Sequence, residues 1–340
     1  MGPVHVLVSA KVTAEQLARM RAVDSRLVIH GEPGGYAIMD ASEVDHKGID
    51  YPDERPDVDV ASLLRQAEVI IATRIPMRLL EVAPQLRWLQ FTSAGVDHLW
   101  KPGLDAGTVT VTSAKGIHGV PIAEFVFGAL LDDAKDLARL RRQQREHHWR
   151  KFLIHELYGR TLLTIGVGEI GAAIAGLAKA FGMHVSAFRR RAGREGVPAA
   201  VDEVVVAAGL TSALGRADYV VASLPLTEHT RGMIGADVFA AMRPSALFVN
   251  VGRGRTVDQA ALIQALERQQ IAGAILDVFE QEPLPADSPL WDLPNVLVSP
   301  HMCADTPMYM ERFIALLCDN LGRYARGEPL RNVVDPKERY

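Results

Sequence analysis

Residues 161–191 read TLLTIGVGEIGAAIAGLAKAFGMHVSAFRRR, and their pattern predicts the fold of the second half of the chain. The apolar run 162–167 is short enough for a buried strand. An alanine-rich segment that follows, up to Phe181, has helical character, and residues 185–188 predict a second strand. Strand, helix and second strand in this order predict a βαβ unit.

Three glycines, Gly166, Gly168 and Gly171, lie between the first strand and the helix with the spacing G-x-G-x-x-G. In a βαβ nucleotide site the first makes a tight turn, and the second lets backbone amides approach a pyrophosphate. The third lets the helix pack closely on the sheet, and the helix N-terminus offers N–H groups to phosphates. A plain turn is the alternative, but the flanking elements favour a dinucleotide site that includes Glu169 and Ile170.

The second strand ends in three consecutive arginines, Arg189, Arg190 and Arg191. An NAD site usually has an acidic residue here, which accepts hydrogen bonds from the adenine-ribose hydroxyls. That carboxylate would repel a 2′-phosphate, whereas guanidinium groups form charge-assisted hydrogen bonds with it of about 1.5–3 kcal/mol each. A solvated basic loop is the alternative. We therefore predict that NADP(H) is the preferred cofactor and that NAD(H) is second to it.

Length and composition describe an ordinary globular protein. The chain has 340 residues, enough for two domains, with 48% hydrophobic residues and a net charge of −4. This charge gives no reason to expect nucleic acid or an acidic membrane surface as a partner. Two cysteines form neither a disulfide framework nor a metal cluster, so no metal is predicted. Residues 1–10 lack the layout of a signal peptide and no apolar run reaches the roughly 20 residues of a membrane span, so we expect a cytoplasmic protein.

Strand and helix patterns alternate along most of the chain, which predicts parallel sheets covered by helices on both faces. The predicted strands are residues 4–9, 27–29, 68–72, 88–91, 162–167, 185–188, 217–223, 246–250, 273–278 and 296–299. The predicted helices are residues 13–20, 61–66, 77–82, 121–147, 258–269 and 308–325. Residues 31–59, rich in Gly, Pro and acidic residues, predict a surface insertion with little regular structure.

The segment 121–147 reads as one long helix that begins at Pro121. Most residues up to Leu131 are apolar, so this part of the helix is expected to be buried on nearly all sides. Such a helix is either central to the core or shared with a second subunit.

Small residues follow the predicted strand 88–91, in the stretch Thr92-Ser93-Ala94-Gly95-Val96-Asp97. Open α/β sheets bind ligands at strand ends, and amide groups around Ala94 and Gly95 would be free to hold an anion. A plain strand-to-helix turn is the alternative. Arg74 follows the end of the predicted strand 68–72. It is either a substrate contact or a surface arginine.

Three polar residues follow strand ends in the second half of the chain, namely Arg253, Glu282 and His301. A 2-oxo acid reductase needs a cation for the carboxylate, an acid that protonates the ketone oxygen, and a group that orients this acid. Arginine, histidine and a carboxylate suit these tasks in turn. On spacing alone, His301 is equally a histidine in a turn, and Arg253 equally a phosphate contact.

The chain resembles the D-isomer-specific 2-hydroxyacid dehydrogenases, and among them the NADP-preferring, glyoxylate/hydroxypyruvate reductase-like members. The motifs that carry the resemblance are TIGVGEIG, ADYVVASLPLTEHTRGMI, ALFVNVGRGRTVDQAALIQAL, GAILDVFEQEPLP, PLWDLPNVLVSPH, SAGVD and VPIAE. The resemblance is strong from about residue 88 to 330, whereas over the first 87 residues it is only generic. Together these motifs are specific for the family and say little about the substrate.

By position, the resemblance implies that Arg253 binds the substrate, that Glu282 partners the histidine, and that His301 donates the proton. Glu280, two residues before Glu282, ranks lower. Further positions are implied as contacts: Asp277 for the nicotinamide carboxamide, Leu224, Pro225, Val251 and Gly252 for the cofactor, and Ala94 and Gly95 for the substrate carboxylate. Two features depart from the family pattern: Arg189 replaces the usual acid, and Met302-Cys303-Ala304 replaces small glycines.

The resemblance also implies an architecture. A Rossmann cofactor domain, residues 113–303, would be inserted in a flavodoxin-like substrate domain, residues 1–112 and 304–340, each with a doubly wound parallel sheet. A homodimer would form through the helix that starts at Pro121. The expected reaction is hydride transfer between NADP(H) and a small 2-oxo acid or D-2-hydroxy acid.

Two other readings stay open. One is a dehydrogenase for a bulkier or phosphorylated D-2-hydroxy acid, because the generic first 87 residues hold the substrate-selecting part. The other is a non-catalytic NAD(H)-sensing regulator on the same scaffold. The set of Arg253, Glu282 and His301 speaks against a sensor, which has no need of a proton donor.

Overall fold

The computed structural model describes residues 2–36, 38, 58–96, 104, 107–189 and 197–337. Arg190 and Arg191, and most of the predicted insertion 31–59, lie outside these ranges. The chain divides into two compact units, one of Met1–Ile117 with Thr306–Tyr340 and one of His118–Asp305. We call them unit 1 and unit 2. From the sequence, the chain was expected to pass from one domain to the other near residue 113 and back near residue 303.

Unit 1 is built on a five-stranded parallel sheet with the order β2-β1-β3-β4-β5. Its strands are β1 Val4–Val8, β2 Leu27–His30, β3 Val69–Ala72, β4 Trp88–Phe91 and β5 Thr110–Thr112. The order 2-1-3-4-5 is that of the flavodoxin-like fold. The fold class predicted for this part of the chain is therefore confirmed.

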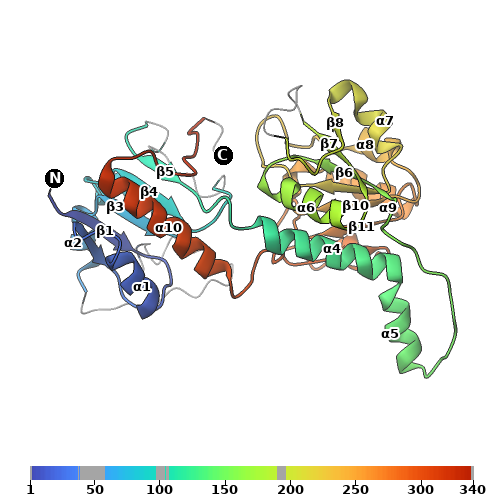
Figure 1. Cartoon of the computed structure of the whole chain (residues 1–340), viewed down its shortest axis with the longest axis horizontal. Coiled ribbons are helices and arrows are strands. Elements are labelled where there is room, and N and C mark those ends of the chain that lie inside the picture. Colours follow the sequence, from blue (N-terminus) through green and yellow to red (C-terminus); the bar gives the residue numbers. More distant parts are fainter. Residues whose placement is uncertain are drawn as a thin grey trace. The chain divides into compact units, whose positions relative to one another are not determined.

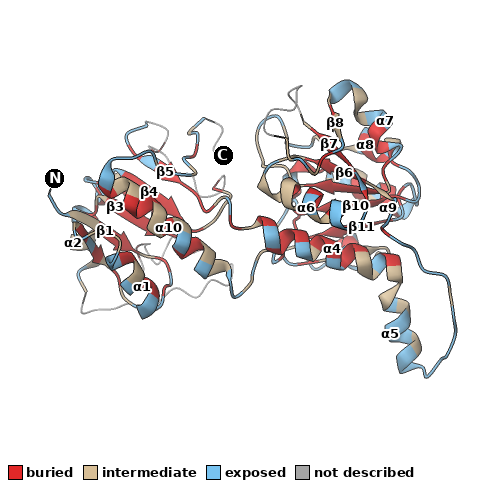
Figure 2. Cartoon of the chain, viewed as in Figure 1, coloured by how far each residue is buried: buried red, intermediate tan, exposed pale blue. Residues whose placement is uncertain are grey.

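Helices cover both faces of the unit 1 sheet (Figure 1). They are α1 Ala14–Arg21, α2 Val60–Gln66, α3 Leu79–Val82 and α10 Tyr309–Arg326. Successive strand residues point to opposite faces: Val6 and Val8 pack in the cluster that includes α1 and α10, while Leu7 packs in the cluster with α2 and α3. Burial on both faces explains why the central strands read as continuous apolar runs, and β3 and β4, buried throughout, are red in Figure 2.

A buried polar network joins α10 to the unit 1 sheet. Trp88 Nε1 donates to Thr112 Oγ1 at 2.7 Å, and this hydroxyl donates to Gln90 Oε1 at 2.7 Å. Asn320 of α10 lies 3.4 Å from the same Gln90 oxygen and exchanges two hydrogen bonds with the backbone of Arg331. Helix α10 thus belongs to unit 1.

Unit 2 contains a seven-stranded parallel sheet with the order β12-β11-β10-β9-β6-β7-β8. Its strands are β6 Thr161–Ile165, β7 His184–Phe188, β8 Glu203–Val205, β9 Tyr219–Ala222, β10 Leu247–Asn250, β11 Gly273–Leu276 and β12 Val296–Val298. Counted from β6, the first six follow the Rossmann order 3-2-1-4-5-6, with β12 added at the edge. The predicted pair of doubly wound parallel sheets is therefore confirmed.

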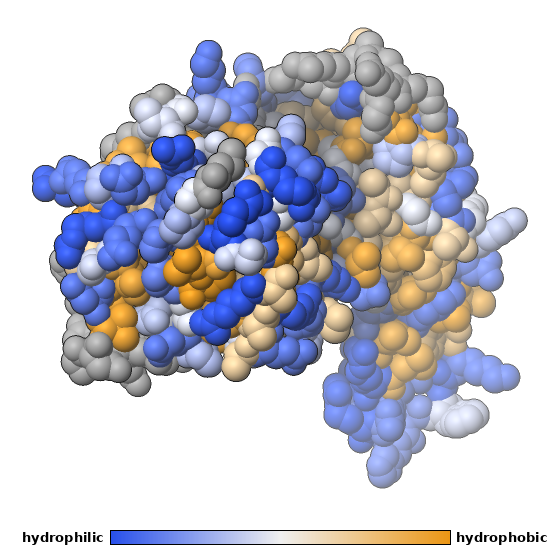
Figure 3. Space-filling model, turned by 60° about the vertical axis from the view of Figure 1, so that its left-hand side comes forward, coloured by the Kyte–Doolittle hydropathy of each residue, from blue (hydrophilic) through white to orange (hydrophobic). Residues whose placement is uncertain are grey.

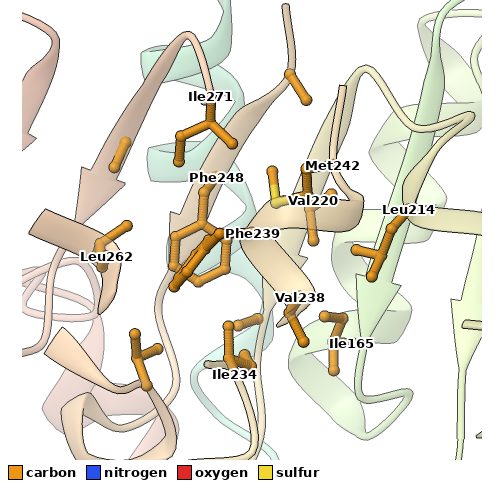
Figure 4. Close-up of a cluster of buried hydrophobic side chains, with 14 of the residues drawn as sticks. Ile165, Leu214, Val220, Ile234, Val238, Phe239, Met242, Phe248, Leu262 and Ile271 are labelled. Carbon is orange, nitrogen blue, oxygen red and sulfur yellow. The ribbon is translucent and has the colours of Figure 1, made fainter. Parts of the chain in front are cut away.

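The unit 2 sheet is also covered on both faces. One face carries α4 Gly119–Lys135 and α6 Glu169–Ala180, and the other carries α7 Leu210–Leu214, α8 Ala236–Ala241 and α9 Gln259–Glu267. In the second layer, Phe239 and Phe248 meet edge to face, with ring centroids 5.4 Å apart (Figure 4). Among the described residues, no helix is both long and apolar enough to cross a membrane.

The prediction of one helix over 121–147 is wrong, because two helices occupy this segment: α4 and α5 Leu137–Arg145. Between them, Asp136 has a left-handed backbone with φ 47°, and its side chain accepts the N–H of Arg139 at 3.2 Å. Asp tolerates this conformation better than most residues. The apolar residues of α4 pack within unit 2, largely against α6, whereas α5 has no buried residue.

Helix α5 and the segment after it project from unit 2 (Figure 1). Helix α5 forms the blue, hydrophilic projection at the bottom of the space-filling view (Figure 3). The predicted surface insertion also needs a correction where the structure describes it. Tyr36 and Ile38 are buried in the core of unit 1, each 7% exposed, so part of this segment contributes to the core.

Candidate active site

The predicted site residues of unit 2 gather at one edge of its sheet, because all seven strands are parallel and their carboxyl ends meet there. In strand order this edge carries His301 after β12, Asp277 after β11, Arg253 after β10, Leu224 after β9, the glycine turn after β6 and Arg189 after β7. The strand order reverses between β9 and β6, which is where open α/β sheets bind ligands.

The glycine turn has the geometry that a dinucleotide requires. Gly166 adopts φ 109°, which L side chains rarely adopt. A Cβ at Gly171 would lie 2.1 Å from the Gly166 carbonyl oxygen, so a side chain there would push α6 away from β6. Helix α6 begins at Glu169, and its first amide groups lack partners within the helix. These features fit the pyrophosphate of a nicotinamide dinucleotide.

Glu169 was predicted among the cofactor contacts, and the structure gives its carboxylate a different partner. Its Oε1 accepts the backbone N–H of Gly119 at 2.9 Å, at the first residue of α4. A carboxylate is favourable at a helix N-terminus. The side chain therefore links the dinucleotide turn to the start of α4, while Ile170, next in the turn, is half-buried.

Leu224 and Pro225 follow β9, beside the glycine turn. Leu224 packs on the hydrophobic core of unit 2, and the carbonyl oxygen of Pro225 accepts the hydroxyl of Thr230 at 2.6 Å. These contacts give the loop a defined conformation at the reversal point of the sheet.

Arg253 lies in a turn that is held from both sides. The preceding Asn250, 1% exposed, accepts the N–H of Gly252 at 3.1 Å and donates to the Arg253 carbonyl oxygen at 3.3 Å. The hydroxyl of Thr256 donates to the same carbonyl at 2.6 Å. Asn250 was not among the residues predicted from the sequence, although an Asn two residues before a Gly, at the end of a buried strand, signals a side-chain-stabilised turn. Val251 is buried within the turn.

The turn of Arg253 also contacts the loop that carries Glu282. A Cβ at Gly254 would lie 1.8 Å from the carbonyl oxygen of Phe279, so the two backbones are in direct contact. The N–H of Phe279 in turn donates to Glu282 Oε1 at 2.9 Å. Arg253 and Glu282 are thereby held on adjoining loops.

Glu282 and His301 form a hydrogen-bonded pair, with Oε2 and Nδ1 2.7 Å apart. The His301 side chain remains 49% exposed, and its backbone adopts φ 54°. Glu280, which ranked lower in the sequence analysis, is exposed, and its backbone carbonyl accepts the Nε–H of Arg255 at 3.2 Å. The structure thus brings together the Arg, Glu and His that the sequence singled out.

The electrostatics of this pair favour a protonated imidazole. The hydrogen bond that His301 donates to Glu282 raises the pKa of His301 above its usual value, against the opposing effects of burial and of Arg253. Burial opposes ionisation of Glu282, but the hydrogen bonds from His301 and the Phe279 N–H outweigh it and lower the pKa of this carboxyl. Both shifts therefore favour a carboxylate on Glu282 beside a protonated imidazole on His301.

Asp277 is fully buried, and its carboxylate accepts hydrogen bonds from the loop of His301. Ser299 Oγ donates to Oδ1 at 2.6 Å, the N–H of Met302 to Oδ1 at 3.0 Å, and the N–H of Cys303 to both oxygens at 3.2 and 3.3 Å. Sequence reasoning assigned Asp277 to the cofactor and missed these contacts.

Arg189 directly follows β7, across the reversal point from Arg253. Its backbone N–H donates to the carbonyl oxygen of Val205 at 3.0 Å, which places it at the carboxyl edge of the sheet. A dinucleotide bound at the glycine turn has its adenine-ribose end at the strand that carries this residue.

The predicted substrate residues Arg74, Ala94 and Gly95 belong to unit 1. Arg74 follows β3 and the other two follow β4, and these strands are neighbours. The hydroxyl of Thr92 donates to that of Thr73 at 3.1 Å, and Tyr309 Oη donates to the carbonyl oxygen of Thr92. The structure therefore brings Arg74 and the Ala94 loop to one edge of the unit 1 sheet.

Comparison with known proteins matches residues 127–303 to the family model for the D-isomer specific 2-hydroxyacid dehydrogenase, NAD binding domain. A glyoxylate reductase of Korarchaeum cryptofilum is 35% identical over 78% of this chain and 81% of its own length. A D-3-phosphoglycerate dehydrogenase of Methanocaldococcus jannaschii is 31% identical over 80% of this chain, which spans 52% of that longer protein.

Solved structures give the same result. The D-isomer specific 2-hydroxyacid dehydrogenase of Xanthobacter autotrophicus in complex with NADPH and MES has a TM-score of 0.78 at 28% identity, with both chains covered fully. An NADPH-dependent glyoxylate/hydroxypyruvate reductase of Sinorhizobium meliloti, in complex with NADP and sulfate, has a TM-score of 0.75 at 28% identity over 100% of each chain.

The fold and the glycine turn define a nicotinamide-dinucleotide-binding oxidoreductase with a separate flavodoxin-like unit. The chain belongs to the D-isomer specific 2-hydroxyacid dehydrogenase family, as the family model and the relatives show. It is thus an enzyme of the D-2-hydroxyacid dehydrogenase type.

Proposed function

We propose that the enzyme is an NADPH-dependent reductase of small 2-oxo acids of the glyoxylate and hydroxypyruvate type. The observation that carries the proposal is the 2.7 Å hydrogen bond between Glu282 and His301, next to the turn of Arg253 and on the sheet edge that holds the glycine turn. The names of the Korarchaeum and Sinorhizobium relatives support this substrate class. NADPH, when bound, supplies the hydride that reduces the carbonyl carbon.

The residues of the pair divide the proton transfer between them. Glu282 engages Nδ1 of His301, so the imidazolium presents its other proton on Nε2. That proton passes to the substrate oxygen as the carbonyl becomes an alcohol, which leaves a neutral imidazole. Arg253 carries a permanent positive charge that holds the substrate carboxylate and polarises the carbonyl.

A direct assay tests the reaction. NADPH oxidation is followed at a fixed pH with glyoxylate, hydroxypyruvate and pyruvate. Turnover of at least one is expected, with kcat reduced at least about 100-fold in His301→Ala and Arg253→Ala. NADPH binding, measured by fluorescence, should change little in either variant. Unaltered kcat in both variants contradicts the assigned roles.

The cofactor preference rests on Arg189 and on the absence of an acid at the end of β7. Relatives with bound NADPH and NADP support it. Arg189→Asp should lower kcat/KM for NADPH about 10- to 100-fold, because it replaces a charge-assisted bond with repulsion. Activity with NADH should be kept. A wild-type kcat/KM for NADH equal to or above that for NADPH would show that the prediction from Arg189 is wrong.

A second substrate class is favoured by the relative named D-3-phosphoglycerate dehydrogenase. Oxidation of 3-phosphoglycerate, and reduction of branched and aromatic 2-oxo acids, therefore belong in the same panel. The highest kcat/KM identifies the substrate class.

We also propose a homodimer. The expectation that the helix starting at Pro121 forms the interface remains a prediction. The segment after α5 carries exposed apolar side chains that could add to this interface. Trp149 and Leu153 are each 96% exposed and Tyr158 is 77% exposed. Exposed large apolar groups of this kind mark association surfaces. A second copy of the chain is the proposed occupant.

A further inference from the structure

The turn that carries His301 has a buried carboxylate as the partner of several of its hydrogen-bond donors. Ser299, two residues before His301, and Met302 and Cys303, directly after it, all donate to Asp277. Within the turn, the N–H of His301 donates to the Ser299 carbonyl at 3.0 Å. Asp277 thereby holds both sides of a short segment whose central residue has a left-handed backbone.

We propose that Asp277 is a positioning residue, which sets the place and direction of the His301 imidazole by anchoring the backbone on both sides of it. This inference rests on the proposed function, in which His301 is the proton donor. Glu282 holds the imidazole ring itself, and Asp277 holds the turn from which the ring extends.

The burial and hydrogen bonding of Asp277 support this role. A fully buried carboxylate is costly unless it is hydrogen-bonded, and the bonds described above satisfy it from one segment of chain. Among the described residues, N–H and O–H donors give Oδ1 three hydrogen bonds and Oδ2 one, the 3.3 Å branch from Cys303, and the Cys303 thiol also bonds to this carboxylate. Oδ2 therefore keeps capacity to accept a hydrogen bond from a nicotinamide carboxamide. One carboxylate would then contact the cofactor and hold the proton donor.

The central experiment is a titration of the His301 imidazole by NMR in the cofactor-free protein, with His301→Ala used to assign the signal. In Asp277→Asn we expect the His301 pKa to fall. The new side-chain NH2 group cannot accept a hydrogen bond from the Cys303 N–H, so the turn that carries His301 is held less firmly. We expect kcat to fall about 10- to 100-fold. An unchanged His301 titration combined with weaker NADPH binding overturns the proposal and leaves only a carboxamide contact.

Asp305→Asn is the matched control. Asp305 is a second carboxylate close enough to His301 for the imidazolium to influence its pKa, although burial raises that pKa overall. Its substitution removes a charge and leaves the bonds from Asp277 to the turn in place. If the His301 pKa falls as much in Asp305→Asn as in Asp277→Asn, the effect comes from charge alone and the anchoring role of Asp277 is overturned.

Amide exchange in the wild-type protein provides a test that needs no variant. The N–H groups of Met302 and Cys303 should exchange slowly with solvent although Met302 is 49% exposed, because Asp277 accepts both. Rapid exchange at both positions overturns the proposal even if Asp277→Asn does not fold. Neither NMR measurement depends on turnover, so a failure to reduce any 2-oxo acid would count against the proposed function and not against this role.

Discussion

Replacement of Glu282 by Gln should shift the pH dependence of reduction, because it removes the charge that favours protonated His301. A hydrogen bond to a charged group contributes about 1.5–3 kcal/mol. The lower end applies, since the His301 side chain is 49% exposed and solvent screens the pair. About 1.4 kcal/mol corresponds to a tenfold lower ratio of imidazolium to imidazole.

The sign of the effect follows from the direction of the His301 pKa, which Glu282 raises. Protonated His301 is present below this pKa and is lost as pH rises through it. In Glu282→Gln the falling limb of kcat/KM should therefore move to lower pH, and activity at a pH on the wild-type limb should drop about tenfold.

The assay is NADPH oxidation from pH 5.5 to 9.5 with saturating cofactor and limiting 2-oxo acid. Glu280→Gln is the matched control, because this glutamate is exposed and lies two residues earlier. Its profile should coincide with that of the wild type. Identical falling limbs in wild type and Glu282→Gln would refute the assignment of His301 as the proton donor oriented by Glu282.

Three further predictions concern the folded state. Gly171→Ala should weaken NADPH binding more than about tenfold and lower the melting temperature, since its Cβ would lie 2.1 Å from a carbonyl oxygen; Gly176→Ala, in the same helix with open space at its Cβ, should leave binding unchanged. Asn320→Ala should reduce the free energy of unfolding in urea by about 2–3 kcal/mol, because it leaves buried polar partners unsatisfied. The double variant Trp149→Ser with Leu153→Ser should yield a 37.1 kDa monomer by light scattering, where the wild type has twice that mass; a monomeric wild type contradicts the dimer.

The wrong prediction of one helix over 121–147 shows that a local sequence pattern does not reveal where a helix stops packing on its unit. The buried residues of α4, which end at Ala134, pack within unit 2, and after this point the helical periodicity continues while burial ends. The left-handed Asp136 marks the place where the chain leaves the surface of the unit. Helix propensity does not report such a change of surroundings.

The relation between Glu169 and α4 is of the same kind. From the motif, Glu169 belongs to the dinucleotide turn, and its spacing relative to Gly166 and Gly171 says nothing about the helix that begins at Gly119. Helices α4 and α6 pack side by side on the sheet, and this packing brings the carboxylate to the first amide of α4.

The parallel sheets, and the edge at which the site lies, were predictable from the sequence. Apolar runs followed by Gly, Arg or His marked the strand ends, and parallel strands bring their carboxyl ends together whatever their order. The hydrogen bonds between the Asp277 carboxylate and the turn of His301, and those between Asn250 and the turn of Arg253, were found only in the folded structure. These contacts depend on strand order and on backbone conformation at individual residues, which act over a few ångströms and leave no periodic signal in the sequence.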